Sequence, residues 1–396
     1  MTDTTRTRSR LVRMLPRDPG QAHRPASTLE LFFDLVFVVA VSTASVQLHH
    51  ALSHGDFVHG ITSYAMLFFA IWWAWMNFTW FATSFDTDDW LYRVLTIVQM
   101  GGVLILAAGV PAAFGEGDFT VPVIGYVVMR VAMICQWLRA SGCGGALRSA
   151  TIRYALGIAA VQVLWFLFLF IPAELRIGAF ALFALIEILV PVFAEYRHQT
   201  PWHPQHITER YGLFTLIVLG ESLLASANAI IDALQKVEAL APLILISVLT
   251  LLMTAALWWI YFWPPHHRAI TSFARSLRYG YTHYFVFAAA AAMSAGIEVQ
   301  IDILTHESHV AGLEAALTIA VPVAVFLIGI WLIAIRDNAD GVVNAVIPIG
   351  AALVLLGALL PQSVLLTTAI LVVIVVVLVI RPPQPHRLGG GKPHSI

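Results

Sequence analysis

About twelve apolar runs of roughly 20 residues follow one another along the chain, and they restrict its fold more than any other feature. Their approximate extents are 28–50, 60–82, 92–114, 121–139, 152–172, 174–194, 209–231, 240–263, 279–300, 312–335, 343–360 and 362–380. A run of this length spans the hydrocarbon core of a bilayer as an α-helix. Only 11% of the residues are charged, which is far below the usual content of a soluble domain. The sequence therefore predicts an all-α, multi-pass membrane protein.

The Lys and Arg residues predict the orientation of these helices, because short cytoplasmic loops collect them. If the N-terminus is cytoplasmic, every Lys and Arg lies on the cytoplasmic side except Arg130, Arg176 and Lys236. We therefore expect both termini in the cytoplasm, with a basic tail at residues 1–26 and a second tail at 383–396.

Three short motifs recur about six helices further along the chain. The pairs are ELFFDLVFVVAVS from Glu30 with ERYGLFTLIVLGES from Glu209, WWAW from Trp72 with WWIY from Trp258, and AGVP from Ala108 with AGIE from Ala295. A unit with an even number of helices keeps its orientation when it is duplicated. We expect two parallel six-helix repeats at 27–200 and 201–382, and chance similarity between apolar helices is the alternative explanation.

Two carboxylates open the first predicted helix, although acids are rare in membrane helices. Glu30 and Asp34 are spaced i, i+4 and therefore share one face, about 6 Å apart along the axis. Ionised acids in such a helix normally face a protein interior or a wet cavity. We interpret the pair as a candidate site. The alternative is that both acids only cap the helix after Ser27 or Thr28.

Further polar residues are expected at two depths. Those near the cytoplasmic face are Asp86, Arg93, Glu209, Arg210 and His283, and the run from Asp86 to Asp89 is equally typical of a solvated loop with an N-cap.

The deeper group consists of Arg130, Glu187 and Glu221, with Glu298 in the AGIE motif. A buried arginine requires a carboxylate partner. Glu221 is the first choice and Glu187 the second, and such a pair either holds helices in register or loads a proton or cation.

Aromatic residues crowd the second helix. Trp72, Trp73 and Trp75 either line a transport path or belong to an interfacial belt. His206 and Glu209 have an i, i+3 spacing found in metal sites, but no second motif completes one. The sequence also lacks a Walker A loop and a dinucleotide fingerprint. We therefore expect no cofactor, no bound metal and no nucleic-acid partner.

Four motifs together resemble one known family. They are ELFFDLVF from Glu30, WWAW leading to FDTDD from Phe85, HITERYGLF from His206 continuing to VLGE at Glu221, and AGIE from Ala295. In this order they resemble the bacterial low temperature requirement protein A family, which implies a multi-pass protein of the bacterial plasma membrane with a link to cold stress. ELFFDLVF also resembles, more weakly, the first helix of the lysosomal potassium and proton channel family, although Phe33 replaces the Ser of its FSD motif and Leu213 stands opposite Asp34 in the second repeat.

The leading hypothesis is a transporter or channel that moves a proton, a cation or a small solute across the lipid bilayer. Its path would be lined by the acids, with Arg130 as a charge partner, and a homo-oligomer is compatible with it. A membrane-embedded, metal-dependent lipid enzyme is the second hypothesis. A structural or regulatory membrane protein without turnover is the third.

Overall fold

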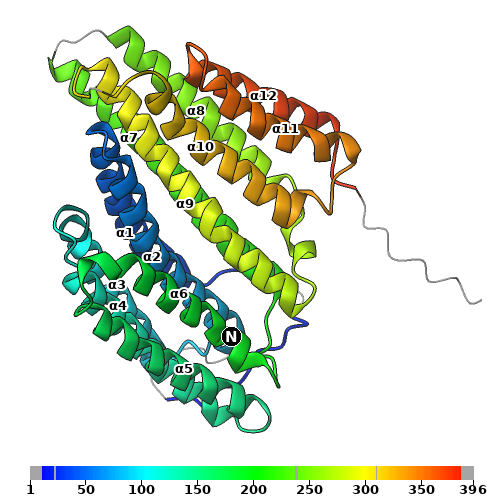
Figure 1. Ribbon diagram of the computed structural model, residues 1–396. Helices are drawn as coiled ribbons and strands as arrows, with labels where there is room; N and C mark the ends of the chain where they lie inside the picture. The colour runs from blue at the N-terminus through cyan, green and yellow to red at the C-terminus, as the bar shows by residue number, and fades with distance from the viewer. Residues whose placement is uncertain (1–10, 22–23, 237–239, 309, 385–396) are drawn as a thin grey trace, which may run out of the picture. The chain divides into compact units, whose positions relative to one another are not determined.

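The computed structural model describes residues 11–21, 24–236, 240–308 and 310–384, and within these ranges it contains twelve α-helices and no strand. They are α1 (Thr28–Ser53), α2 (Phe57–Phe85), α3 (Trp90–Gly115), α4 (Thr120–Ala140), α5 (Leu147–Phe168), α6 (Ala173–Glu195), α7 (Pro204–Lys236), α8 (Leu240–Phe262), α9 (Phe273–Leu304), α10 (Gly312–Ile330), α11 (Gly341–Gly357) and α12 (Ser363–Ile380) (Figure 1). Eleven of them are long and apolar enough to cross a membrane, and only α11 is shorter. The prediction of an all-α, multi-pass membrane protein is confirmed.

The helices form two compact units, Met1–Ile217 and Val218–Ile396. The division lies inside α7 and therefore differs from the repeat boundary expected at residue 200, while the repeat itself stays a prediction. Unit 1 contains α1 to α6 and the first part of α7, coloured from blue to green in Figure 1. In this unit α1 packs on α2 and α3, α3 on α4, and α5 between α4 and α6.

Glycines bring α3 and α4 of unit 1 into close contact. A Cβ atom on Gly102 would overlap Met129 and the carbonyl oxygen of Gly125, and one on Gly125 would overlap the backbone at Leu106. The two backbones can approach this closely only because both positions lack a side chain. The contact fixes the register of the antiparallel pair, with Gly102 at the depth of Met129.

Unit 2 contains the rest of α7 and the helices α8 to α12. Within it α9 packs on α10, α11 on α10 and α12, and α8 on α12. A π-helical turn at Trp331–Ile335 continues α10. Gly296, in the AGIE motif, lies against the backbone of Thr318 on α10, so this motif also marks a close helix contact.

Polar side chains define where the first and third helices begin. Ser27 and Glu30 form a capping box at α1, in which Ser27 Oγ accepts from the Glu30 N–H and Glu30 Oε2 accepts from the Ser27 N–H. Asp89 caps α3 by accepting from the N–H of Tyr92 at 3.0 Å. Asp89 thus provides the N-cap that was considered for this acidic run.

Candidate functional site

Glu30 and Asp34 face the interior of unit 1 and are only 1% and 0% exposed. Glu30 caps its helix with Oε2 and uses Oε1 for an ion pair, so the capping interpretation describes half of its role. Asp34 lies one turn deeper and takes no part in the cap. Two fully buried carboxylates on one helix face require compensating donors, since unpaired charges there are costly.

Arg210 on α7 provides most of those donors. Its Nη1 lies 2.9 Å from Glu30 Oε1, its Nη2 lies 2.5 Å from Asp34 Oδ1, and its Nε lies 3.1 Å from Asp34 Oδ2. Asp34 therefore receives a bidentate, charge-assisted pair from a guanidinium group that is itself fully buried. The structure brings together three residues that the sequence had placed near one membrane face.

Trp75 and His206 complete the group, which we call the Arg210 cluster (Glu30, Asp34, Trp75, His206 and Arg210). The indole N–H of Trp75 on α2 donates to Asp34 Oδ1 at 2.7 Å. His206 is fully buried and lies one helical turn before Arg210, with its Nε2 3.1 Å from Glu30 Oε1. One signal could have indicated His206, because its i, i+4 spacing with Arg210 matches that of Glu30 with Asp34.

Residues preceding α1 cover the end of α2 beside this cluster. Arg24 is 4% exposed and donates to the backbone carbonyls of Ala82 and Thr83, while Arg17 pairs with Asp86 at 2.7 Å. The carbonyls at a helix C-terminus carry partial negative charge, which suits a guanidinium group. Arg17 and Arg24 of the predicted basic tail are therefore packed against the end of α2.

Burial affects the ionisation of these residues outside the membrane helices. Burial raises the pKa of Asp86, and the nearby Glu30 carboxylate raises it further, against the opposing charges of Arg17 and Arg24. Burial also lowers the pKa of Arg24. Asp86, Arg17 and Arg24 thus form a group of charges that partly compensate one another.

Arg93 and Glu209 are two of the predicted site residues that lie outside the cluster. Arg93 is 40% exposed and pairs with Asp88, which is 48% exposed, at 2.7 Å. Glu209 is half-buried and accepts from the backbone N–H of Ala26 at 3.3 Å. Neither residue contacts the carboxylates of α1 in the interactions that the structure records for them.

A second buried ion pair lies deeper in unit 1. Arg130 Nη2 on α4 is 2.9 Å from Glu187 Oε1 on α6, so Arg130 has the second of its two expected partners. Glu187 also accepts from the Tyr126 hydroxyl at 2.6 Å and from the Trp165 indole N–H at 2.7 Å. We call these four residues the Glu187 cluster. All of them are at most 5% exposed.

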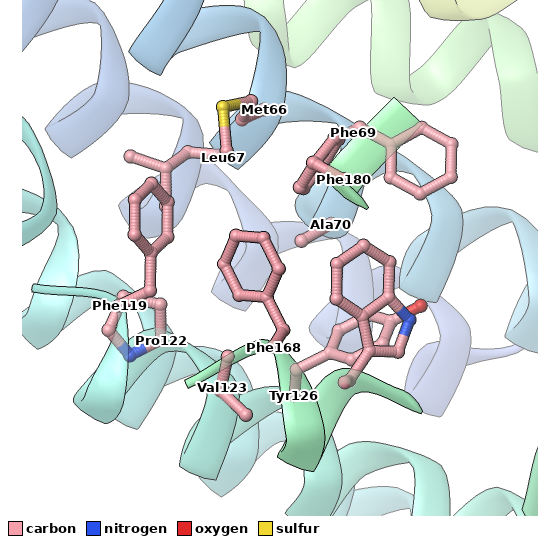
Figure 2. A pocket seen from close by; sticks show the side chains of 11 residues that line it. Met66, Leu67, Phe69, Ala70, Phe119, Pro122, Val123, Tyr126, Phe168 and Phe180 are labelled. Atoms are coloured by element: carbon pink, nitrogen blue, oxygen red, sulfur yellow. The ribbon is translucent and has the colours of Figure 1, made fainter. Parts of the chain in front are cut away.

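An apolar pocket adjoins the Glu187 cluster, and Figure 2 shows its wall. It encloses about 390 Å³ of empty space, part of which is open to the surroundings. Tyr126 and Trp165 line it, and Phe119, Phe168 and Phe180 provide further aromatic wall. The polar ends of Tyr126 and Trp165 are both bound to Glu187, so the wall offers the pocket only apolar surface.

His283 belongs to unit 2 and lies in a hydrogen-bonded group there, which we call the histidine–tyrosine ring (Tyr261, His266, Tyr279 and His283). His283 Nδ1 lies 2.8 Å from the Tyr279 carbonyl, and His266 Nε2 lies 2.6 Å from the Tyr261 carbonyl. A carbonyl only accepts, so both nitrogens carry a hydrogen. The remaining nitrogens lie 3.0 Å from the hydroxyls of Tyr261 and Tyr279, which donate to neutral imidazoles. Burial lowers the pKa of His266 to about 4.

Glu221 and Glu298 are the remaining predicted acids, and both belong to unit 2. Glu221 is 9% exposed on α7, and Glu298 is half-buried on α9. Trp72 and Trp73 are buried in unit 1, where Trp73 stacks on Phe69.

Among the residues that the structure describes, no three His, Cys, Asp or Glu side chains are arranged to hold a metal ion.

Comparison with known proteins agrees with the membrane architecture. Residues 25–379 match the family described as bacterial low temperature requirement A protein (LtrA). An uncharacterised protein of Rhizobium meliloti (strain 1021) is 31% identical over 254 residues, which are 62% of this chain and 60% of that protein. This chain therefore spans about three fifths of the relative's length. No solved structure matches the chain. With the family match covering most of its length, the chain belongs to the bacterial low temperature requirement A protein family and is an integral membrane protein.

Proposed function

We propose that this protein moves protons across the bacterial plasma membrane, alone or coupled to a small solute, and that the Arg210 cluster is its proton-binding site. The observation that carries the proposal is the composition of the cluster. Glu30 and Asp34 share a single arginine, and His206 lies 3.1 Å from Glu30. A buried group of this composition can exchange one proton between an imidazole and a carboxylate.

The charges of the cluster support this assignment. With His206 neutral, the two carboxylates and Arg210 leave one negative charge among buried groups. One added proton makes the cluster neutral, and neutral groups are far cheaper to keep away from water. Arg24 adds positive potential nearby, but its recorded hydrogen bonds go to Thr83 and to the Ala82 carbonyl.

The orientation expected from the Lys and Arg residues would place this cluster at the cytoplasmic ends of α1 and α7. A proton bound there would be exchanged with the cytoplasm. The Glu187 cluster would then lie closer to the outer face. Membrane carriers commonly bind their coupling ion at such intramembrane carboxylates.

Proton flux into liposomes tests the proposal. Purified wild-type protein is reconstituted with an enclosed pH dye, and an inward pH gradient is applied beside a potassium gradient. We expect wild-type flux to exceed that of protein-free liposomes, and Asp34→Asn and His206→Gln to abolish the excess. The matched control is Glu195→Gln, because Glu195 is also a buried carboxylate of unit 1 but bonds to Tyr154 and Thr200.

A structural role is the second candidate, because every charged group of the cluster has an opposite partner. Such a cluster would hold α1 and α7 together without turnover. Folded wild-type protein without proton flux would contradict the transport proposal and leave the structural role. Flux in wild type that Asp34→Asn leaves unchanged would remove the cluster from the transport path.

A further inference from the structure

Polar side chains continue from the Arg210 cluster along α3 into the membrane. Tyr92, Thr96 and Gln99 are spaced i, i+4 and i+7, so they lie on one face of the helix. Their exposed fractions are 1%, 0% and 2%. Polar residues in a membrane helix are uncommon and usually have a functional or assembly role, so a buried line of three requires an explanation.

Gln136 on α4 joins these residues into one network, which we call the polar track (Tyr92, Thr96, Gln99 and Gln136). Its Nε2 lies 3.3 Å from Thr96 Oγ1 and 3.5 Å from the Tyr92 carbonyl, and its Oε1 accepts from Gln99 Nε2 at 3.4 Å. These hydrogen bonds are long compared with the usual N–H···O distance of about 2.9 Å. The track is therefore connected but loosely bonded.

The track lies between the depths of the two ion-paired clusters of unit 1. At one end Tyr92 lies within electrostatic reach of Glu30 and Arg210. At the other end, the register of α3 and α4 determines the depth of Gln99 relative to Arg130. Gly102 packs at Met129, so Gln99 lies close to the depth of Arg130. From Tyr92 to Gln99 the helix rises by about 10 Å.

Buried polar atoms along this line have no hydrogen-bond partner among the described residues. They are the Tyr92 hydroxyl and Nε of Arg130, and Nη2 of Arg130 touches Glu187 without hydrogen-bond geometry. Both side chains are 1% exposed. Buried atoms of this kind are ordinarily satisfied by internal water, which bridges groups too far apart to bond directly.

We infer that a file of internal water molecules runs along the polar track and conducts protons between the Arg210 cluster and the Glu187 cluster. This inference rests on the proposed function and adds the route to it. Each proton hops from one water molecule to the next, with one O–H bond forming as another breaks, and the hydroxyl and amide groups of the track orient the water by hydrogen bonds. The file ends at the apolar pocket beyond Glu187, because an apolar wall does not hold an ordered water chain (Figure 2).

Replacing the glutamines tests this route. Gln99→Leu and Gln136→Leu each replace an amide with an apolar side chain beside the proposed water molecules. We expect each to slow proton flux about tenfold or more, as for the loss of a hydrogen-bonded step. Gln136→Glu keeps a polar group of similar size and should retain most of the flux. The matched control is Gln300→Leu, because Gln300 joins α9 to the Ala315 carbonyl in unit 2 and should not affect the route.

Radiolytic hydroxyl labelling provides a readout that does not depend on transport. Brief X-ray exposure labels residues that contact internal water, and we expect Tyr92 and Met129 to be labelled in wild type and protected in Gln136→Leu. Folded leucine variants with unchanged flux and labelling would overturn the route, while loss of flux in Asp34→Asn would still support the proposed function. Labelling without any wild-type flux would overturn the proposed function and the conducting role of the file.

Discussion

The Arg210 cluster and the histidine–tyrosine ring both keep polar side chains hydrogen-bonded in the protein interior, the first with charged groups and the second without. Trp75 and Tyr261 occupy matching places in the motifs WWAW and WWIY, on α2 and α8. Trp75 donates to the Asp34 carboxylate, whereas Tyr261 donates to neutral His283. Both groups are buried polar networks, but only the first contains charges, and only the first can change its net charge by exchanging a proton with a carboxylate.

The two networks should differ in how much stability is lost when one residue is removed from each. Removing a partner from a charged network leaves a buried charge uncompensated, which is expensive. Removing a member of a neutral network leaves unpaired donors or acceptors, which cost less. Three measurements test whether charged and neutral networks differ in this way.

The largest effect is expected when Arg210 is replaced. Arg210→Met leaves two buried carboxylates without their cation and should lower the free energy of unfolding by about 3–5 kcal/mol. His283→Leu, which removes two hydrogen bonds from the ring, should cost about 1–3 kcal/mol. Thermal unfolding of both variants in the same detergent gives the comparison.

Arg210→Lys serves as the control, because it restores the charge without the bidentate geometry and should recover part of the loss. Equal destabilisation by Arg210→Met and His283→Leu would show that the distinction between charged and neutral networks does not govern stability.

An intermediate effect is expected from pH. The pKa of His266 is lowered to about 4 from its ordinary value of about 6.5. The unfolded chain therefore binds a proton more readily, and the stability contribution is complete above about pH 6.5. It is lost as the pH falls towards 4, by about 3 kcal/mol at most. Unfolding temperatures between pH 7.5 and 4.5 measure this loss.

His266→Gln isolates the histidine from other groups that titrate in this range. Glutamine can accept from Tyr279 and donate to the Tyr261 carbonyl, as His266 does, but it does not ionise. The gap between wild type and this variant should change between pH 6.5 and 4.5. A constant gap would mean that the ring does not oppose protonation.

The smallest effect is expected outside both networks. Arg93 and Asp88 form an exposed ion pair, so Arg93→Gln should change the free energy of unfolding by less than about 0.5 kcal/mol. The change should shrink further at high salt. A loss comparable with that of His283→Leu would show that exposed charges matter as much as the buried network.

Much of the fold followed from the sequence, because spanning a bilayer leaves few alternatives to long apolar helices. The run predicted at 312–335 matches α10 with its π-helical continuation to Ile335. Helix ends were harder to place where polar residues extend the helix. α7 begins at Pro204 although its apolar run begins near residue 209, so His206 lies inside the helix and reaches Glu30.

The candidate site was predicted only in part. Buried acids at Glu30 and Asp34 indicated that a cation was needed, but nothing local identified Arg210 among several candidates. Arg130 likewise pairs with Glu187, because the packing of α4 and α6 decides between partners at similar depth. The sequence does not single out Gln99 and Gln136, because uncharged residues hardly interrupt an apolar run. Their hydrogen bond also depends on the close contact between α3 and α4.

The ion pair between Asp34 and Arg210 joins residues that lie 176 positions apart in the chain. At synthesis rates of about 5–20 residues per second, the ribosome needs roughly 10–35 s to make the intervening segment. α1 therefore enters the bilayer long before its cation exists. Carrying its acids protonated avoids a cost of about 2.5–3.5 kcal/mol for an ionised one at mid-membrane depth. The arrival of α7 with Arg210 would then allow acids of a helix inserted much earlier to ionise, so that assembly of unit 1 would release protons.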